Sequence, residues 1–447
     1  MTDFSSLPLI PALAPGIDAL GYTAMTPVQA LSLPPILEGR DVIAQAPTGS
    51  GKTAAFGLGL LNRLDPATIR TQALVLCPTR ELADQVGKQL RKLATGIPNL
   101  KLLVLTGGVP LGPQLASLEA HDPQVVVGTP GRVQELARKR ALNLGQVRTF
   151  VLDEADRMLD MGFEEPIREI AGRTHKERQS LLFSATFPDE IRELARALLN
   201  EPVEVTIDGQ QEAPAIKHLF FEVESAHRQK ALAGLLLKYT PESAVVFCNT
   251  RKDVDEVANS LRQFGFSALA LHGDMEQRDR DEVLLQFSNR SCNVLVASDV
   301  AARGLDVEDL AAVVNYEMPS DLDTYRHRVG RTARAGRERH RADALEAGQG
   351  SALDWQKTPL ATARPAQLPQ AAMTTLRIDG GKTDKLRAGD ILGALTGDAG
   401  LSAKAIGKID IFPTRSYVAI AHEHAGKAVA RLEAGKIKGK RFRVRKM

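Results

Sequence analysis

The sequence has few cysteines and no long apolar run, and each absence excludes a class of protein. Its three cysteines among 447 residues, Cys77, Cys248 and Cys292, are scattered and show no paired spacing. Such thiols do not build a disulfide framework, so we expect a reducing, cytoplasmic environment. Secretion and membrane spanning are not expected, because no stretch of about eighteen apolar residues occurs and Asp3 stands where a secretion signal would be basic.

A glycine-rich segment carries the clearest chemical signal. Residues 46–53 read Ala-Pro-Thr-Gly-Ser-Gly-Lys-Thr, after a strand-like stretch and before a helix-like one. A helix N-terminus with free N–H groups favours phosphate. Gly49 and Gly51 allow close backbone approach, while Lys52 can reach phosphates and Thr53 can bind magnesium. The segment begins with alanine where the general pattern has glycine.

An acidic pair adds the second half of a nucleotide site. Asp153 and Glu154 follow the apolar run 149–152, so they stand at the end of an expected strand. A magnesium ion and an attacking water need carboxylates at such a position. Together with the phosphate loop, the pair predicts an enzyme that consumes a nucleotide.

Short β-rich runs alternate with amphipathic segments over most of the chain. This rhythm is typical of an α/β fold with a parallel sheet covered by helices on both faces. The expected strands of a first domain, which ends near Ile207, lie at 41–45, 73–77, 101–105, 124–127, 150–152 and 180–183. A second set, without a phosphate loop, lies at 244–248, 268–271, 293–297 and 312–315.

The net charge of +3 is distributed unevenly along the chain. Residues 373–447 contain 16 Lys and Arg against 7 Asp and Glu, a net charge of +9. The preceding 372 residues contain 41 against 47, a net charge of −6. We therefore expect the basic C-terminal part to bind a polyanion.

Further short motifs follow one another in a fixed order. They lie at 78–83, 107–108, 129–132, 184–186, 247–250, 272–274, 298–306 and 327–334. With the phosphate loop and Asp-Glu-Ala-Asp at 153–156, they resemble the motifs of the DEAD-box RNA helicases over roughly residues 1–336. The resemblance implies two tandem RecA-like domains, ATP and Mg²⁺ as cofactors, and RNA as the partner.

The resemblance also implies an adenine-reading motif near the N-terminus. The amide of Gln29 would bond the edge of adenine while the ring of Phe4 stacks on the base. The ATP-binding residues implied in this way are Phe4, Gln29, Ala46, Pro47, Thr48, Gly49, Ser50, Gly51, Lys52, Thr53, Gly304 and Asp306.

RNA contacts are implied in both domains, since each motif places a small turn, a hydroxyl or an arginine where a phosphate could lie. These residues are Pro78, Thr79, Arg80, Gly108, Thr129, Arg132, Thr250, Arg251, Gly273, Ser298 and Asp299. Ser298 replaces the family's commoner threonine but keeps its hydroxyl. Residues implied to couple the ATP and RNA sites are Asp156, Ser184, Thr186 and His327.

Catalysis is expected from groups that act together. Lys52 would bind the phosphates of ATP, and Thr53 and Asp153 would hold Mg²⁺. Glu154 orients or deprotonates the attacking water. Arg331 and Arg334 would reach the γ-phosphate when the two domains close, because a planar cation stabilises the charge that develops there. Closure would make ATP and RNA binding cooperative, and the resemblance implies local melting of short duplexes.

The C-terminal part has the element order βαββαβ of an RNA recognition motif, with expected elements at 375–378, 388–395, 406–411, 416–420, 425–432 and 442–445. Arg377 replaces the first stacking aromatic and Tyr417 remains, so basic side chains are favoured over base stacking. An unrelated α+β domain with a solvated basic face is the alternative.

This part resembles the tail of the bacterial DbpA group of helicases. The resemblance implies binding of a hairpin in 23S ribosomal RNA during assembly of the large subunit, and we expect a monomer. The tail residues expected to contact RNA are Arg377, Lys436, Lys438, Lys440 and Arg441.

One departure from the family follows the last motif. Residues 337–343 run into a polar, helix-like stretch where the family continues into a hydrophobic strand, so we expect about one strand to be missing after Arg339. The expected domains are 1–207, 208–355 and 373–447, with a linker at 356–372 that is rich in Pro, Ala and Gln. Two interpretations remain: an RNA-dependent ATPase that remodels ribosomal RNA, or an RNA-binding protein with an impaired motor.

Overall fold

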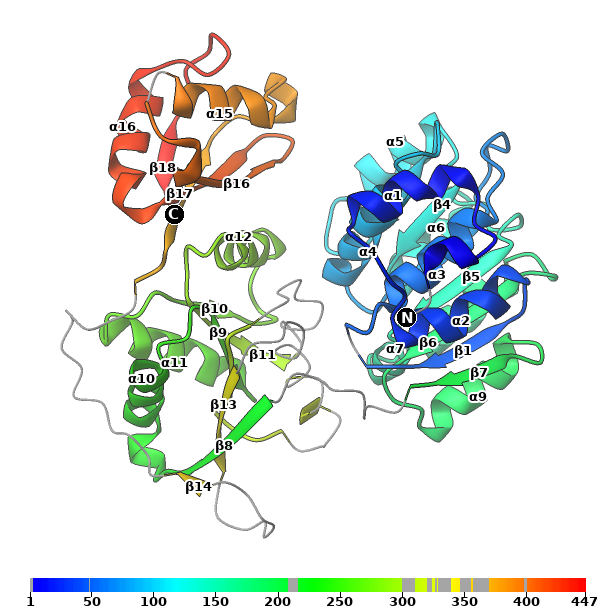
Figure 1. Ribbon diagram of the computed structural model, residues 1–447, viewed down its shortest axis with the longest axis horizontal. Coiled ribbons are helices and arrows are strands. Elements are labelled where there is room, and N and C mark those ends of the chain that lie inside the picture. The colour runs from blue at the N-terminus through cyan, green and yellow to red at the C-terminus, as the bar shows by residue number, and fades with distance from the viewer. Residues whose placement is uncertain are drawn as a thin grey trace. The chain divides into compact units, whose positions relative to one another are not determined.

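The computed structural model describes residues 3–47, 49–207, 216–299, 310–319, 324–325, 328, 339–345, 355–356, 370–397 and 400–447 (Figure 1). Side chains are described throughout these ranges except at 216–218, 339–345 and 355–356. The chain divides into two compact units near residue 213. The three cysteines are free and buried, as core residues would be. Among the described residues, no helix has the length and apolar character needed to cross a membrane.

The first unit is built on a parallel sheet in the order β3-β4-β2-β5-β6-β1-β7. Its strands are β1 (Val42–Gln45), β2 (Ala73–Leu76), β3 (Leu102–Leu105), β4 (Val125–Gly128), β5 (Thr149–Asp153), β6 (Gln179–Ser184) and β7 (Val203–Thr206). The central strands are nearly continuous apolar runs, because both faces of a parallel sheet are covered. The six strands expected from the sequence are confirmed, and β7 is an additional one.

Helices cover the two faces of this sheet in two groups. One apolar core contains buried residues of α1 (Ala14–Ala19), α2 (Pro27–Leu37), α3 (Lys52–Asn62) and α4 (Arg80–Leu93). The other core contains residues of α5 (Leu111–Ala120), α6 (Pro130–Arg138), α7 (Ala155–Asp160), α8 (Glu164–Gly172) and α9 (Asp189–Leu198).

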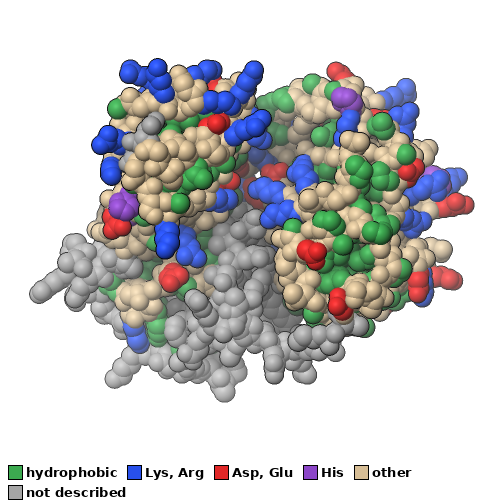
Figure 2. All heavy atoms as spheres, turned by 45° about the horizontal axis from the view of Figure 1, so that its top comes forward, with side chains coloured by type: hydrophobic (Ala, Val, Ile, Leu, Met, Phe, Trp, Pro, Cys, Tyr) green, Lys and Arg blue, Asp and Glu red, His purple; other side chains and the backbone are tan. Residues whose placement is uncertain are grey.

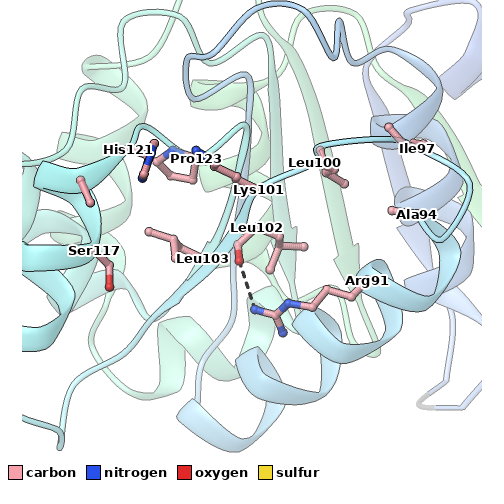
Figure 3. A pocket seen from close by; sticks show the side chains of 11 residues that line it. Arg91, Ala94, Ile97, Leu100, Lys101, Leu102, Leu103, Ser117, His121 and Pro123 are labelled. Atoms are coloured by element: carbon pink, nitrogen blue, oxygen red, sulfur yellow. Dashed lines mark hydrogen bonds between the residues drawn. The ribbon is translucent and has the colours of Figure 1, made fainter.

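One backbone carbonyl at the β3 edge of the sheet is bound by an arginine side chain. A cavity of about 580 Å³ lies there between α4 and α5 (Figure 3). The guanidinium of Arg91 reaches across it and donates a hydrogen bond to the carbonyl of Leu102, with an N–O distance of 3.1 Å. A satisfied edge carbonyl is a poorer template for pairing with another chain.

The second unit begins with a parallel sheet in the order β10-β11-β9-β12-β13-β8-β14. Its strands are β8 (Ile216–Glu222), β9 (Ala244–Cys248), β10 (Ala268–Leu271), β11 (Val294–Ser298), β12 (Ala312–Asn315), β13 (Arg339–Leu345) and β14 (Trp355–Gln356). The described helices that accompany it are α10 (Arg228–Tyr239), α11 (Arg251–Gln263) and α12 (Gln277–Ser288). The four strands expected here are confirmed.

The expectation of a polar, helix-like stretch after Arg339 is wrong. Residues 339–345 form β13, which pairs in parallel with β12 on one side and with β8 on the other. Two neighbouring strands each need a partner for their backbone N–H and C=O groups, and that requirement does not depend on side-chain polarity. The sheet position that we expected to be empty is therefore filled. Gln356, the first residue of the expected linker, belongs to β14, and residues 357–369 lie outside the described ranges.

The tail forms an antiparallel sheet in the order β16-β17-β15-β18. The order βαββαβ is confirmed, with β15 (Met373–Ile378), α15 (Ala388–Thr396), β16 (Ile406–Ile411), β17 (Ser416–Ala421), α16 (Ala425–Ala434) and β18 (Val444–Lys446). Leu376, Val418 and Ile420 of the sheet share a buried core with Ile391 of α15 and Leu432 of α16. The tail thus has a hydrophobic core of its own.

Candidate active site

The glycine-rich segment joins β1 to α3. Gly49 and Gly51 have φ values of +85° and +97°, a left-handed conformation that favours glycine. Lys52 is the first residue of α3 and is only 6% exposed. Its ammonium group donates a hydrogen bond to the carbonyl of Ala46 at 2.9 Å, so the loop folds around the lysine. Thr48 lies outside the described residues.

The expected adenine-reading residue is tied to this loop. The side-chain amide of Gln29 donates to the carbonyl of Gly51 at 3.1 Å and accepts from the backbone N–H of Thr26 at 2.9 Å. Phe4 is buried in the core, with its ring stacked on Tyr22 at a centroid distance of 6.1 Å. Its stacking on adenine remains a prediction.

The acidic pair stands at the turn from β5 into α7. Glu154 has φ 53° and ψ 53°, a left-handed conformation that is uncommon for a residue with a side chain. Burial, together with the nearby Glu154 and Asp156 carboxylates, raises the pKa of Asp153 from 3.8 to about 7, against the opposing charge of Lys52. In the sheet only β6 separates β5 from β1, so the acidic pair and the phosphate loop share one edge.

The expected coupling residues bind one another. The carboxylate of Asp156 accepts from the hydroxyl and the backbone N–H of Thr186, both at 2.9 Å. The hydroxyl of Ser184 in turn accepts from the backbone N–H of Asp156 at 3.2 Å. The end of β6 is therefore joined to the start of α7. His327 lies outside the described residues.

The segments of the first unit expected to contact RNA follow β2, β3 and β4 at the same edge. Thr79 caps α4 by accepting from a backbone N–H, and the hydroxyl of Thr129 accepts from the N–H of Gly107 at 3.3 Å. The side chain of Arg132 is only 9% exposed, and it donates to Gln114 and to the carbonyl of Val109. Arg132 thus fixes the loop after β3 and does not project from it. Pro78, Arg80 and Gly108 adjoin these contacts in the sequence.

In the second unit, the sequence analysis assigned no role to Arg328, whose guanidinium makes several hydrogen bonds. Arg328 is 2% exposed, and its guanidinium binds both carboxylate oxygens of Asp299 at 2.6 Å. It also donates to the side chains of Asn249 and Asn315 at 2.9 Å. The sequence signal that could have identified Arg328 was its position within the motif, between His327 and Arg331. Asp299, expected at the RNA, is thereby held by an arginine.

Other expected residues of this unit stand at strand ends. Thr250 follows β9 and caps α11, and Arg251 forms an ion pair with Asp274. Ser298 ends β11 and is buried, while Gly273 follows β10. Gly304, Asp306, Arg331 and Arg334 lie outside the described residues.

In the tail, Arg377 differs from the other expected RNA contacts. It is 7% exposed and pairs with Asp379 at 2.9 Å and with Glu282 of α12 at 3.4 Å. The carboxylate of Glu282 also accepts from the hydroxyl of Tyr417 at 2.9 Å. By contrast, Lys436, Lys438, Lys440 and Arg441 are exposed, and Figure 2 shows many Lys and Arg side chains on the tail, in the upper left of the view.

Family models match three parts of the chain. Residues 26–194 match the DEAD/DEAH box helicase model, 227–336 the helicase conserved C-terminal domain, and 375–446 the DbpA RNA binding domain. The chain belongs to the DEAD-box family of ATP-dependent RNA helicases. Its tail is an RNA-binding domain of the DbpA type, as the sequence analysis expected.

The chain is also similar to individual DEAD-box proteins. The chain is 50% identical to the ATP-dependent RNA helicase DbpA of Escherichia coli, over 100% of this chain and 99% of that protein. It is 42% identical to a DEAD-box helicase CshA of Geobacillus kaustophilus over 75% of this chain and 72% of that protein. A structure of S. cerevisiae Dbp5 bound to RNA and ADP BeF3 matches 78% of this chain and 90% of its own, with a TM-score of 0.71 and 32% identity.

The close packing of the DEAD-box phosphate loop predicts that Gly51→Ala abolishes tight ATP binding. A Cβ atom at residue 51 would lie 2.4 Å from the amide nitrogen of Gln29, and the φ of +97° would be strained. Titration with a fluorescent ATP analogue should show at least a tenfold loss of affinity. Gly172→Ala is the control, because a Cβ atom there meets nothing within 4 Å; equal affinities for both variants would contradict the prediction.

The raised pKa of Asp153 predicts pH-dependent stability of the nucleotide-free helicase. The folded state favours the protonated carboxyl, so the stabilising contribution is largest below pH 3.8 and is lost as the pH rises toward about 7. Asp153→Asn, which cannot ionise, should therefore raise the Tm more at pH 8 than at pH 5. Thermal unfolding at both pH values measures the difference. The exposed Asp18→Asn serves as control, and gains for Asp153→Asn that do not depend on pH would refute the prediction.

Proposed function

We propose that this helicase uses ATP and Mg²⁺ to remodel 23S ribosomal RNA during assembly of the large ribosomal subunit in the cytoplasm. The observation that carries the proposal is the DbpA-type tail, whose family model covers residues 375–446. Its net charge of +9 suits a polyanion such as ribosomal RNA. The three unpaired cysteines support a reducing compartment.

The residues present fit a magnesium ion beside the phosphate loop. Burial, with a smaller contribution from the neighbouring carboxylates, raises the pKa of Asp153, so its charged form lacks solvation that a divalent cation would replace. Mg²⁺ is usually held by one or two carboxylates together with substrate phosphates. Asp153 and the hydroxyl of Thr53 would hold it here. When bound, the ion would neutralise charge on the phosphate oxygens.

The other roles in ATP hydrolysis fall to residues of the protein itself. Lys52 binds the β- and γ-phosphates, and the backbone N–H groups of the loop surround them. Glu154 orients the attacking water and accepts its proton. Arg331 and Arg334 stabilise the charge on the transferred phosphoryl group when the closed state forms, and RNA binding favours that state.

Recognition of the ribosomal RNA is assigned to the exposed cations of the tail. Lys436, Lys440 and Arg441 are exposed on one short stretch, and Lys440 keeps this exposure although its ammonium group lies 3.9 Å from a carboxylate oxygen of Asp384. We place Arg377 in a supporting role, because its guanidinium is already paired with Glu282 and Asp379. The alternative of an RNA-binding protein with an impaired motor rested on a missing strand. The pairing of β13 with β12 and β8 at that place in the sheet weakens this alternative.

The proposed role of Glu154 predicts that the Glu154→Gln variant binds ATP and RNA but hydrolyses ATP very slowly. The amide has nearly the same shape as the carboxylate but cannot accept the proton of the water. Loss of a general base typically costs about 100-fold to 10,000-fold in rate. Single-turnover hydrolysis with saturating RNA measures the effect, and the exposed Glu165→Gln is the control. A rate close to that of the unmodified helicase would remove Glu154 from this role.

The tail assignment predicts a change in salt dependence. Replacing Lys436, Lys440 and Arg441 together with glutamine removes about three phosphate contacts, so the slope of log K against log salt should fall in magnitude by about 2. Binding of the full chain to a 23S ribosomal RNA fragment measures it. In the same variant, ATPase stimulation should no longer favour that fragment over unrelated RNA.

A matched control changes the same charge elsewhere on the tail. Lys404, Lys427 and Arg431 are exposed and can also be replaced with glutamine. This variant should keep the preference for 23S ribosomal RNA. If both triple variants lose the same affinity and the same slope, the tail binds only through its net charge. If neither loses the preference, specificity does not lie in the tail cations named here.

A further inference from the structure

A buried ion pair joins the expected general base to the helix that follows it. The guanidinium of Arg157, in the first turn of α7, lies 3.1 Å from a carboxylate oxygen of Glu154. The two side chains are only 6% and 7% exposed. A buried charge is costly unless it is paired, so neither side chain can leave this contact without replacing it.

The helix that carries Arg157 is itself fixed in place. Asp156, the preceding residue, binds Thr186 through the hydrogen bonds described above. The backbone N–H of Arg157 also donates to the carboxylate of Asp156 at 3.0 Å. The backbone of Arg157 is therefore anchored to the segment that follows β6, and its guanidinium pairs with Glu154.

The orientation of the Glu154 side chain needs such a constraint, because the local backbone does not fix its rotamer. It lies between β5 and α7 in a left-handed conformation, with no helical neighbour before it. A glutamate side chain at such a junction has several rotamers, and only some of them would direct a carboxylate oxygen toward a water at the γ-phosphate. The buried positive charge of the guanidinium, 3.1 Å from a carboxylate oxygen, keeps the Glu154 side chain beside α7.

We propose that Arg157 is a positioning residue for ATP hydrolysis, which holds the Glu154 carboxylate in the orientation that receives the proton of the attacking water. The inference rests on the proposed role of Glu154. In the step concerned, the water oxygen bonds to the γ-phosphorus while the bond from that phosphorus to the bridging oxygen of ADP breaks. The proton of the water passes to Glu154, and Arg157 exchanges no proton.

The first test replaces Arg157 with methionine, which fills similar space without charge. Because a misplacement of about 1 Å can cost roughly 100-fold, the single-turnover rate should fall by about that factor at saturating RNA and ATP. The KM for ATP should stay within about threefold, since Arg157 does not contact the phosphates in this scheme. Arg157→Lys keeps the charge without the planar group and should recover part of the rate.

The second test is a double-mutant cycle with Glu154→Gln. If Arg157 acts only through the carboxylate of Glu154, adding Arg157→Met to Glu154→Gln should reduce the residual rate no further. A merely structural role would lower the rate in both backgrounds. An equal loss in both backgrounds, or a rise in KM with an unchanged rate, would overturn the inference.

Stability is controlled with a second internal arginine of the same unit. Arg178, before β6, donates to the carbonyls of Ala171 and Leu198 and lies over the ring of Phe150. Arg178→Met should lower the Tm without changing the single-turnover rate. If Arg157→Met does not fold, the Arg157→Lys rate in the two Glu154 backgrounds decides the question.

The two proposals fail in different ways. Full turnover by Glu154→Gln would reject the role of Glu154 itself. An inactive Glu154→Gln together with a fully active Arg157→Met would reject only the positioning role.

Discussion

The candidate active site of the first unit depends on the parallel pairing of β1, β6 and β5. Because the strands run in one direction, their carboxyl ends meet at one edge of the sheet, and the loops that follow them are brought together. The register pairs Gln45 with Ser184 and Asp153 with Phe183. Ser184 therefore stands between the glycine-rich loop and the acidic pair, so a single strand connects the proposed ATP site to the residues expected to couple it to RNA.

The three acidic residues at this edge differ in how their buried negative charge is compensated. Asp156 accepts from the N–H and hydroxyl groups of Thr186, in the segment that follows β6. Glu154 is paired with Arg157. Asp153 gains only partly from Lys52, since burial and its acidic neighbours still raise its pKa to about 7. The least compensated carboxylate is thus the one at which a cation brought with ATP would be stabilised most.

Much of this arrangement could be predicted from the sequence, because apolar periodicity and short motifs report local constraints. The phosphate loop, Asp153 and the tail order βαββαβ are of this kind. The polar β13 was missed, because the two strands beside it provide the pairing that its residues do not suggest. Arg328 and the Arg157–Glu154 pair were missed for another reason: pairing of buried charges depends on three-dimensional neighbours, and a motif does not specify them.

The buried arginines change the interpretation of the motifs expected to contact RNA. A motif arginine suggests a phosphate contact, yet Arg132 and Arg377 direct their guanidinium groups to protein acceptors. Loops that must present backbone groups in a fixed geometry need internal donors to hold them, and the five N–H groups of an arginine serve this purpose well. A motif therefore predicts which loops lie near RNA, while the atoms that would face RNA are expected to come from the loop backbone and hydroxyls. Exposed cations remain on the tail, as at Lys436 and Arg441. Binding of RNA in the first unit should accordingly depend more on loop geometry than on net charge, and the reverse should hold for the tail.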